Sequence, residues 1–538
     1  MALRLALFLS TSAALLLGIA MPAAAATYPP GFGERVMVSG LTRPMDVAWA
    51  PDGRMFVIQK DGQLLVVPPG SSRARVVADL SYQVNGQLER GLLGLAVDAH
   101  FAENGYVYLL FTFDIDPPAA GERESPGPMV SQLRRVEVDP ANRVVSSTPI
   151  LGTDTSGVCP APANEVDCIP SDGTTHSIGT VRADPDGTLW VGSGDGYSEE
   201  AEFPARAYDQ ESMAGKIMHI DRDGNGLPGH PFCPGETNLD LVCTKIHAQG
   251  FRNPFRFTLR PGGGLVVGDV GWTTREELNL VDAVGGGNYG WPCREGKLAT
   301  PNYTTLCSGL TLPEPVIDPV YDYPHLGSQS IVGGPTYTGS GYPTAYRNSI
   351  FFGDFAAGFI RRLVPNRAGG FRARRFATDW RGVALELAPN GALVSVNPDD
   401  FGARSGTITR IRYSADVHGP RLRLLSVQPF RGLISGRARD SSGVRRVMVA
   451  VRRKPPRGGC SWWLRGRRRM STGRRRCDRP RWMNAELERI SSGVRWKVRL
   501  AGKLPPGRFR VLVDAADRRG NVSRLPRKRA SLVRVRKR

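Results

Sequence analysis

The sequence predicts an all-β protein, a six-bladed β-propeller over residues 31–413 followed by a small immunoglobulin-like β-sandwich over residues 421–538. Two observations favour this fold class. Six segments of the longer region repeat one pattern, a β-rich run, a turn and a second β-rich run, which is typical of a hairpin. No stretch of similar length shows the apolar periodicity of long helices. The units leave enough chain for four strands each, as propeller blades require.

The six predicted hairpins are spread along the whole of the longer region. They begin at Met45, Leu95, Arg182, Phe257, Thr336 and Ala384. Four of them turn through Pro-x-Gly, in which glycine tolerates the positive φ of a tight turn, and the units at Leu95 and Thr336 have longer turns. An array of β-sandwiches is the alternative arrangement for the same strands. In a propeller, loops from several blades converge at one mouth, so we expect functional residues between the repeats.

The region after residue 413 differs from the first in pattern and in charge. From Arg421 onward, strand-like runs are separated by Ser-Ser-Gly and Arg-Arg-Gly-Asn turns, as in an immunoglobulin-like sandwich. Residues 414–538 hold 37 Lys and Arg against 7 Asp and Glu, a net charge of +30, whereas the remaining chain holds 34 against 43, a net charge of −9. This basic excess favours an anionic cell-surface polymer as partner, and no nucleic acid is expected. A basic surface without a partner is the alternative.

The first 26 residues have the pattern of a secretory signal peptide. Arg4 gives a charged start, Leu5 to Met21 form an apolar run, and small residues end at Ala26. An uncleaved membrane anchor is the alternative. The eight cysteines form four couples, Cys159 with Cys168, Cys233 with Cys243, Cys293 with Cys307, and Cys460 with Cys477. Such spacing favours four disulfides, so we expect a secreted or cell-surface protein.

Several reactive side chains lie in the predicted loops beside the hairpins. His176 precedes the hairpin that begins at Arg182, and Asp195 follows it. Arg252 and Asn253 precede the next hairpin, and further carboxylates follow that one. Each of them alone could serve a loop structure. Together they supply a base with a pKa of about 6.5, a cation for anionic oxygens and ligands for a hard metal ion, which an alcohol oxidation requires.

A series of motifs follows the order found in a known family. They read ERGLLGLA from Glu89, THSIG with GSGDG, SMAGKIMHIDRDGNGLPGHPF from Ser212, GFRNPF from Gly250, GDVG with EELNLV and GGGNYGWP, and VGGPTYTG with YRNSIFFGDF. Over residues 31–413 the sequence resembles the soluble glucose/sorbosone dehydrogenase family. That family includes the aldose sugar dehydrogenases that depend on pyrroloquinoline quinone (PQQ), which are six-bladed propellers. Several motifs in order are far more specific than any single one.

The resemblance implies a reaction and a set of site residues. The catalytic residues are His176 and Asp195, the cofactor-binding residues are Glu89, Arg252 and Asn253, and the calcium-binding residues are Glu277 and Tyr289. His176 resembles the general base that takes the proton from the C1 hydroxyl of an aldose while hydride passes to PQQ and the sugar becomes a lactone. Asp195 resembles the acidic partner of that base. An arginine suits the carboxylates of PQQ, and a calcium ion polarises the quinone oxygens. The motifs do not indicate the electron acceptor.

Two positions depart from the family pattern. Glu89 stands where quinone-binding members commonly have glutamine, and Ile178 replaces a glycine that follows the histidine. An added negative charge repels a tricarboxylate cofactor. The departures favour a catalytically silent propeller that binds a partner, as in hedgehog-interacting-protein-like relatives. A calcium-dependent lactone hydrolase is a second alternative, because that chemistry also occurs on six-bladed propellers, although a hydrolase has no need of Arg252.

Overall fold

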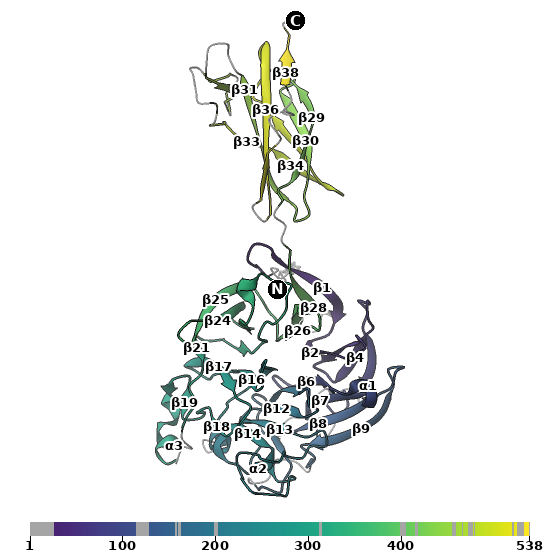
Figure 1. The fold of residues 1–538 in the computed structure, drawn as a ribbon, viewed down its shortest axis with the longest axis vertical. Coiled ribbons are helices and arrows are strands. Elements are labelled where there is room, and N and C mark those ends of the chain that lie inside the picture. The colour runs from purple at the N-terminus through teal and green to yellow at the C-terminus, as the bar shows by residue number, and fades with distance from the viewer. Residues whose placement is uncertain are drawn as a thin grey trace, which may run out of the picture. The chain divides into compact units, whose positions relative to one another are not determined.

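The computed structural model describes most of the chain, and Figure 1 shows its course. The described residues are 26–114, 129–155, 159, 163–197, 203–310, 315–398, 405–414, 418–453, 459–464, 466–467, 469–471, 477, 479–518, 521–524 and 532–536. The predicted signal peptide lies outside them, except for its last residue, Ala26. Within this part of the chain, no helix has the length and apolar character needed to cross a membrane.

The chain separates by its internal contacts into two compact units. Unit 1 comprises Met1–Thr27 and Val36–Arg410, and unit 2 comprises Tyr28–Arg35 and Ile411–Arg538. All six predicted hairpins belong to unit 1, and the basic region belongs to unit 2.

Unit 1 is built from sheets of four or five strands, almost all of them antiparallel. Three sheets are β2 (Pro44–Trp49), β3 (Met55–Gln59), β4 (Gln63–Val67) and β5 (Arg75–Asp79); β6 (Leu92–Val97), β7 (Tyr106–Phe113), β8 (Met129–Val138), β9 (Val144–Leu151) and β10 (Ile169–Ser171); and β11 (Ile178–Ala183), β12 (Leu189–Ser193), β13 (Lys216–Ile220), β14 (Ile246–Gln249) and β18 (Gly287–Asn288). Three more are β15 (Arg256–Leu259), β16 (Leu265–Asp269), β17 (Arg275–Val281) and β21 (Tyr321–Pro324); β22 (Ile331–Val332), β23 (Ile350–Asp354), β24 (Phe359–Pro365) and β25 (Phe371–Thr378); and β26 (Ala384–Leu387), β27 (Leu393–Asn397), β28 (Gly406–Tyr413) and β1 (Phe32–Leu41).

Shorter elements lie in the connections of unit 1. They are the ribbon of β19 (Arg294–Glu295) and β20 (Leu298–Ala299), the helices α1 (Phe101–Asn104), α2 (Val242–Lys245) and α3 (Thr304–Ser308), and the 3-10 turns η1 (Phe203–Tyr208), η2 (Pro301–Tyr303) and η3 (Thr344–Tyr346). The structure therefore confirms the all-β prediction.

Each predicted hairpin supplies the first two strands of a separate sheet. The unit predicted from Thr336 differs in detail, because its first strand is Ile331–Val332 and Thr336 makes only an isolated bridge with Ile350. Pro335 lies between them, and proline has no N–H to donate to a ladder. The first strands meet in order, since β2 contacts β6, β6 contacts β11, β11 contacts β15 and β15 contacts β22. The last sheet joins the series because its strand β26 contacts β23 of the preceding sheet. β26 also contacts β2 of the first sheet, so the sheets surround a common centre (Figure 1).

A buried arginine joins its own sheet to four others. Arg256, on β15, is 1% exposed, and its guanidinium donates to the carbonyl oxygens of Leu93, Gly179 and Met45 at 2.9, 2.8 and 2.9 Å and to that of Val383 at 3.0 Å. The acceptors belong to β6, β11, β2 and the residue before β26. Burial lowers the pKa of Arg256 to about 10, so it remains charged at neutral pH. One side chain thus links innermost strands that are far apart in the sequence.

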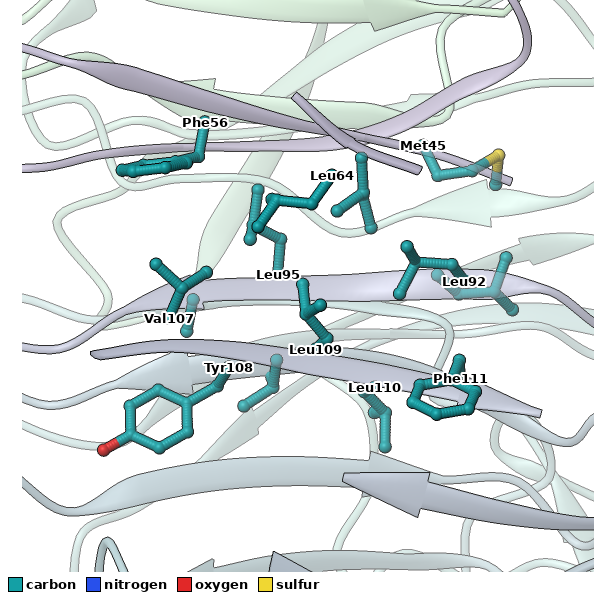
Figure 2. Packing of buried hydrophobic residues seen from close by; sticks show 14 of the residues in the cluster. Met45, Phe56, Leu64, Leu92, Leu95, Val107, Tyr108, Leu109, Leu110 and Phe111 are labelled. Carbon is teal, nitrogen blue, oxygen red and sulfur yellow. The ribbon is translucent and has the colours of Figure 1, made fainter. Parts of the chain in front are cut away.

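Apolar side chains fill the space between neighbouring sheets. Figure 2 shows Met45, Phe56 and Leu64 of one sheet packed against Leu92 and Leu95 of the next. Each of them is at most 7% exposed. Burial of such side chains contributes about 1.5–3 kcal/mol each, so the apolar runs that predict the hairpins also hold the sheets together.

Unit 2 consists of two sheets with a shared core. One has the order β29 (Arg421–Gln428), β30 (Leu433–Arg439), β35 (Gly493–Arg499) and β34 (Glu486–Ile490). The other has the order β32 (Ser461–Trp462), β31 (Val444–Arg453), β36 (Gly507–Asp517) and β37 (Val522–Arg524), with β33 (Met483–Asn484) on β31 and β38 (Leu532–Val535) on β36. Ile434 and Trp496 of the first sheet pack with Val449 and Val511 of the second.

All four predicted disulfides form. They are Cys159–Cys168, Cys233–Cys243, Cys293–Cys307 and Cys460–Cys477. The Cys460–Cys477 bond does not join the two sheets of unit 2. Cys460 instead packs with Trp462 on Ala450 and Leu512, which belong to β31 and β36. This disulfide therefore braces a segment over one sheet.

Candidate active site

Several loops of unit 1 converge on one pocket. Its lining residues are His176, Asp195, Tyr197, Pro204, Arg252, Trp272, Trp291 and Tyr303. His176 precedes β11 and Asp195 follows β12, its antiparallel partner. A hairpin returns the chain to the end at which it started, so residues that flank it come together. Three residues that the sequence singles out, His176, Asp195 and Arg252, therefore share this pocket.

The ring of His176 is held in one orientation. The residue has a φ of 52°, in the left-handed region that histidine adopts more readily than most residues. Its backbone N–H donates to Glu89 at 3.1 Å, and its carbonyl accepts from the N–H of Gly196 at 3.0 Å. Nδ1 lies 3.0 Å from Oδ1 of Asp195. Nε2 makes no hydrogen bond with any described residue, so it is the ring atom left for a ligand.

Asp195 determines which ring nitrogen carries the proton. Burial by itself would raise the pKa of its carboxyl, but the charge and hydrogen bond of His176 and the charge of Arg252 lower it below the usual value. An ionised carboxylate only accepts, so Nδ1 carries the hydrogen and donates. Oδ2 accepts from Nε1 of Trp291 at 2.9 Å, which holds the carboxylate in place. Nε2 of the neutral ring is therefore a proton acceptor.

Asp269, at the end of β16, anchors the next pair of predicted residues. Its carboxylate accepts from the backbone N–H of Arg252 at 3.1 Å and from that of Asn253 at 2.6 Å. Nη1 of Arg252 donates to two loop carbonyls at 3.0 and 2.6 Å, and its guanidinium carbon lies 5.4 Å from the centroid of the Trp291 ring. Nε of Arg252 is buried without an acceptor in the described residues. Asn253 is buried next to the pocket but does not line it.

The two departures from the family pattern lie beside His176 and do not line the pocket. Glu89 is exposed, and Oε2 accepts the backbone N–H of His176. Ile178 is 2% exposed and packs in the hydrophobic core of unit 1. The negative charge of Glu89 is therefore next to the candidate base, whereas the extra side chain of Ile178 is absorbed by the core.

Glu277 forms a buried pair of carboxylates with Asp269. The two residues are directly opposite on β17 and β16. Burial raises the pKa of both carboxyls, and the charge of Asp269 raises that of Glu277 further. Glu277 accepts from the N–H of Gly296 and, at 3.2 Å, from Nδ2 of Asn279, whose Oδ1 is buried without a donor in the described residues. Uncompensated oxygens of this kind suit a cation.

Tyr289 does not present its side chain to Glu277. Its hydroxyl donates to the carbonyl of Leu280 at 2.9 Å, and its ring stacks on Phe251 with 4.7 Å between the centroids. A role in binding a metal ion would therefore fall to its backbone carbonyl. The part of the chain that the structure describes holds no group of three or more His, Cys, Asp or Glu side chains suited to a metal ion.

The pocket also has an aromatic wall, which the sequence reasoning missed. Trp272 stacks on Tyr303 at 5.2 Å, and both meet Trp291 edge-on at 6.3 and 5.5 Å. Tyr197 meets the ring of His176 edge-on at 5.4 Å. In a chain that is 41% hydrophobic, aromatic residues by themselves do not indicate a binding site, because most of them are core residues. Here the wall suits the apolar face of a ring-shaped ligand.

One buried carboxylate holds this wall in place. Oε1 of Glu295 accepts the backbone N–H groups of four consecutive residues from Trp272 to Arg275, at 2.6, 2.9, 3.0 and 3.1 Å. Glu295 is 1% exposed, and these hydrogen bonds outweigh burial and lower the pKa of its carboxyl. It lies in the segment closed by Cys293–Cys307, which also carries Tyr303. Glu295 is therefore a positioning residue for Trp272.

Comparison with known proteins identifies the family. Residues 41–404 match the family described as Glucose / Sorbosone dehydrogenase. The chain belongs to this family. Among curated relatives, quinoprotein glucose dehydrogenase B of Acinetobacter calcoaceticus is 27% identical over 277 residues, which is 48% of this chain and 52% of that protein. The HIPL2 protein of Arabidopsis thaliana is 28% identical over 335 residues, 54% of this chain and 47% of that protein. The chain thus spans about half the length of the curated relatives it matches.

Solved structures of sugar dehydrogenases share the fold of this chain. The PQQ-bound aldose sugar dehydrogenase of Streptomyces coelicolor covers 72% of this chain and 100% of its own, with a TM-score of 0.52 and 20% identity. A putative oxidoreductase (glucose dehydrogenase) of Thermus thermophilus covers 71% and 100%, with a TM-score of 0.51 and 25% identity. Membership of the family supports an oxidoreductase of the sugar dehydrogenase type.

Proposed function

We propose that this glucose/sorbosone dehydrogenase family member is an exported quinoprotein that oxidises the C1 hydroxyl of aldose sugars to lactones, with PQQ as hydride acceptor and calcium assistance. The observation that carries the proposal is the His176–Asp195 pair, whose Nε2 faces a pocket that also holds Arg252. The PQQ-bound and quinoprotein relatives support the choice of cofactor. The electron acceptor that regenerates the cofactor stays open.

The residues present fit the proposed cofactor and metal ion. Nε of Arg252 is a buried donor without an acceptor, which suits a carboxylate of PQQ. The paired carboxylates of Asp269 and Glu277 and the free Oδ1 of Asn279 supply oxygens for calcium, with the Tyr289 carbonyl as a further candidate ligand. When bound, PQQ would accept the hydride, and calcium would make it a better acceptor.

The chain's own residues perform the proton transfer in this mechanism. Nε2 of His176 takes the proton of the C1 hydroxyl as hydride leaves C1. Asp195 keeps the hydrogen on Nδ1 and stabilises the imidazolium that forms, because its ionised oxygen lies 3.0 Å away. Trp272 and Tyr303 line the pocket and would shield the sugar ring from water.

The finer description of the fold is part of the proposal. We propose that the six larger sheets of unit 1 are the blades of a six-bladed propeller over residues 31–413, supported by the cyclic contacts of their first strands. We propose that residues 421–538 form an immunoglobulin-like sandwich, supported by its two sheets around one core. Four disulfides support export to an oxidising compartment, and the basic charge supports an anionic cell-surface polymer as partner of unit 2.

A catalytically silent binding propeller is the second candidate function. Glu89 favours it, because a carboxylate beside His176 repels an anionic cofactor. The match to the plant HIPL2 protein also keeps this candidate open.

Purified full-length protein is expected to oxidise aldoses only after addition of both PQQ and calcium. The measurement is dye-linked oxidation of a panel of aldoses, together with the absorbance spectrum of PQQ on titration with protein. Arg252 is proposed to bind PQQ and Glu277 to bind calcium, and the reaction needs both ligands. Either addition alone should therefore leave the rate at background. An unchanged PQQ spectrum at micromolar protein would reject the enzyme and favour the silent propeller.

Replacing Glu295 with alanine is expected to raise the KM for sugar about tenfold and to change kcat less than about threefold. The four N–H groups that hold Trp272 lose their acceptor, so substrate binding weakens while His176 and Asp195 stay in place. The control is Glu236→Ala, because Glu236 also accepts two backbone N–H groups but lies outside the pocket lining. If kcat of Glu295→Ala fell about tenfold, as much as KM is expected to rise, a role in positioning the aromatic wall would be contradicted.

A further inference from the structure

One sheet of unit 2 presents a row of cations on its outer face. Along β30 and β35, residues alternate strictly between the core and the outside, with Ile434, Ala438, Val494, Trp496 and Val498 buried. The outward positions of β29, β30 and β35 carry Arg421, Arg423, Arg437, Arg439, Arg495, Lys497 and Arg499. We call these residues the cation ladder. Of the seven, all but Arg437 are exposed.

The register of the strands places like charges side by side. Arg423 is directly opposite Arg437, and Arg437 is directly opposite Arg495. Arg421 is directly opposite Arg439 in the same way. Strands in a sheet are about 4.8 Å apart, and like charges in directly opposite positions destabilise a sheet. An anionic ligand across the strands would remove this repulsion.

The chain itself neutralises only one edge of the cation ladder. On β34, Glu488 lies 3.8 Å from Arg495, and Glu486 lies 3.2 Å from Lys497. Within the described residues, no carboxylate lies within ion-pair distance of the other five cations. Nε of Arg437 is buried and lacks an acceptor among the described residues. Most of the ladder therefore has charge to offer to a partner.

The opposite sheet of unit 2 has directly opposite arginines only in pairs within the described residues, such as Arg508 with Arg534, and part of it is covered. Cys460 and Trp462 pack over Ala450 of β31 and Leu512 of β36, and the Cys460–Cys477 disulfide braces this cover. The face of the β29–β30–β35–β34 sheet carries long cationic side chains instead. The cation ladder differs in that three cations, Arg423, Arg437 and Arg495, are directly opposite in one row, a row of three that the described residues of the other sheet do not show.

We propose that the cation ladder binds a linear polymer of carboxylated sugars that lies across the strands. Six of the seven cations are arginines, and a guanidinium fork pairs with a planar two-oxygen carboxylate more specifically than an ammonium does. Single-stranded nucleic acid is disfavoured, because the four strands carry a single aromatic residue, Trp496, which is fully buried and cannot stack on bases. The inference builds on the anionic partner proposed for unit 2 and is independent of sugar oxidation.

The test uses the full chain and a triple variant of the central row, Arg423→Ser with Arg437→Ser and Arg495→Ser. The probe is polygalacturonate, with affinity measured between 50 and 300 mM salt. The control is Arg445→Ser with Arg508→Ser and Arg534→Ser, which removes the same charge from exposed arginines of the other sheet. We expect the ladder variant to lose at least about tenfold in affinity at 0.1 M salt and to show a flatter salt dependence, and the control to lose less than about threefold.

Equal losses in the two variants would overturn the proposal in favour of binding by net charge alone. A phosphodiester polymer or single-stranded DNA that binds the native chain more tightly than polygalacturonate would overturn the carboxylate assignment. Both variants should oxidise sugar at the native rate, so failure of this proposal is distinguishable from failure of the proposed enzyme. Both should also unfold at the native temperature, which excludes loss of folding as the cause of weaker binding.

Discussion

His176→Asn is expected to lower the turnover of aldose oxidation by ~10²–10⁴ and to leave PQQ affinity nearly unchanged. Asparagine tolerates the left-handed backbone at this position, where φ is 52°, so folding should be preserved. Its amide is unable to take a proton near neutral pH, so the step assigned to Nε2 is lost. Arg252, which is proposed to contact the cofactor, is untouched. Turnover and PQQ affinity are to be measured on the same preparation.

The matched control for this variant is His100→Asn. His100 also lies near a carboxylate, with Nδ1 at 3.7 Å from Asp98, but it does not line the pocket. It should retain full turnover. If the His176 ring merely ties its loop to Asp195, its replacement would instead weaken PQQ binding and lower the melting temperature, with turnover per bound cofactor nearly intact. A turnover loss below about tenfold at unchanged folding would remove His176 from the role of base.

Arg256→Met is expected to lower the free energy of unfolding by at least about 3 kcal/mol. Methionine fills part of the space but donates no hydrogen bond, so the buried carbonyls of Met45, Leu93, Gly179 and Val383 lose their shared donor. An orphaned buried acceptor costs about 1–3 kcal/mol, and four are left here, with partial relief from relaxation of the strands. The measurement is chemical denaturation of the purified protein.

Arg134→Met is the matched control for Arg256→Met. Among the described residues, Arg134 of β8 donates only to Gln132 of its own strand, so its loss leaves no described carbonyl of another sheet without a donor. We expect a change below about 1 kcal/mol. Arg256→Lys should recover part of the lost stability, because an ammonium keeps the charge but offers three donors in place of five. Equal effects of the two methionine variants would contradict a special role for Arg256 in joining the sheets.

The sequence predicted most of what depends on near neighbours in the chain. The hairpins follow from runs of β-forming residues around Pro-x-Gly turns, and each became the first strand pair of its own sheet. The disulfides join cysteines only 9 to 17 residues apart, so their couples were evident from spacing. His176 and Asp195 flank one hairpin, and a hairpin brings its two flanks together, so their proximity follows from the strand pattern alone.

Contacts between distant segments were beyond the reach of the pattern. Trp272 and Tyr303 lie on different segments, and a single carboxylate, Glu295, sets the position of one against the other through four backbone groups. The resemblance predicts Tyr289 as a calcium ligand, which stays a prediction. The fold packs its ring on Phe251, so the pattern did not show that its backbone carbonyl, and not its hydroxyl, is the candidate ligand atom.

The charge of unit 2 shows the division between sequence and structure most clearly. The sequence alone determined that residues 414–538 carry a net charge of +30 and that their strands alternate. It could not determine that Arg423, Arg437 and Arg495 stand in one row, since a slip of one residue in the pairing would turn every side chain to the other face. Register is set by the core that Trp496 and its neighbours fill, so only the tertiary structure decided where the charges gather.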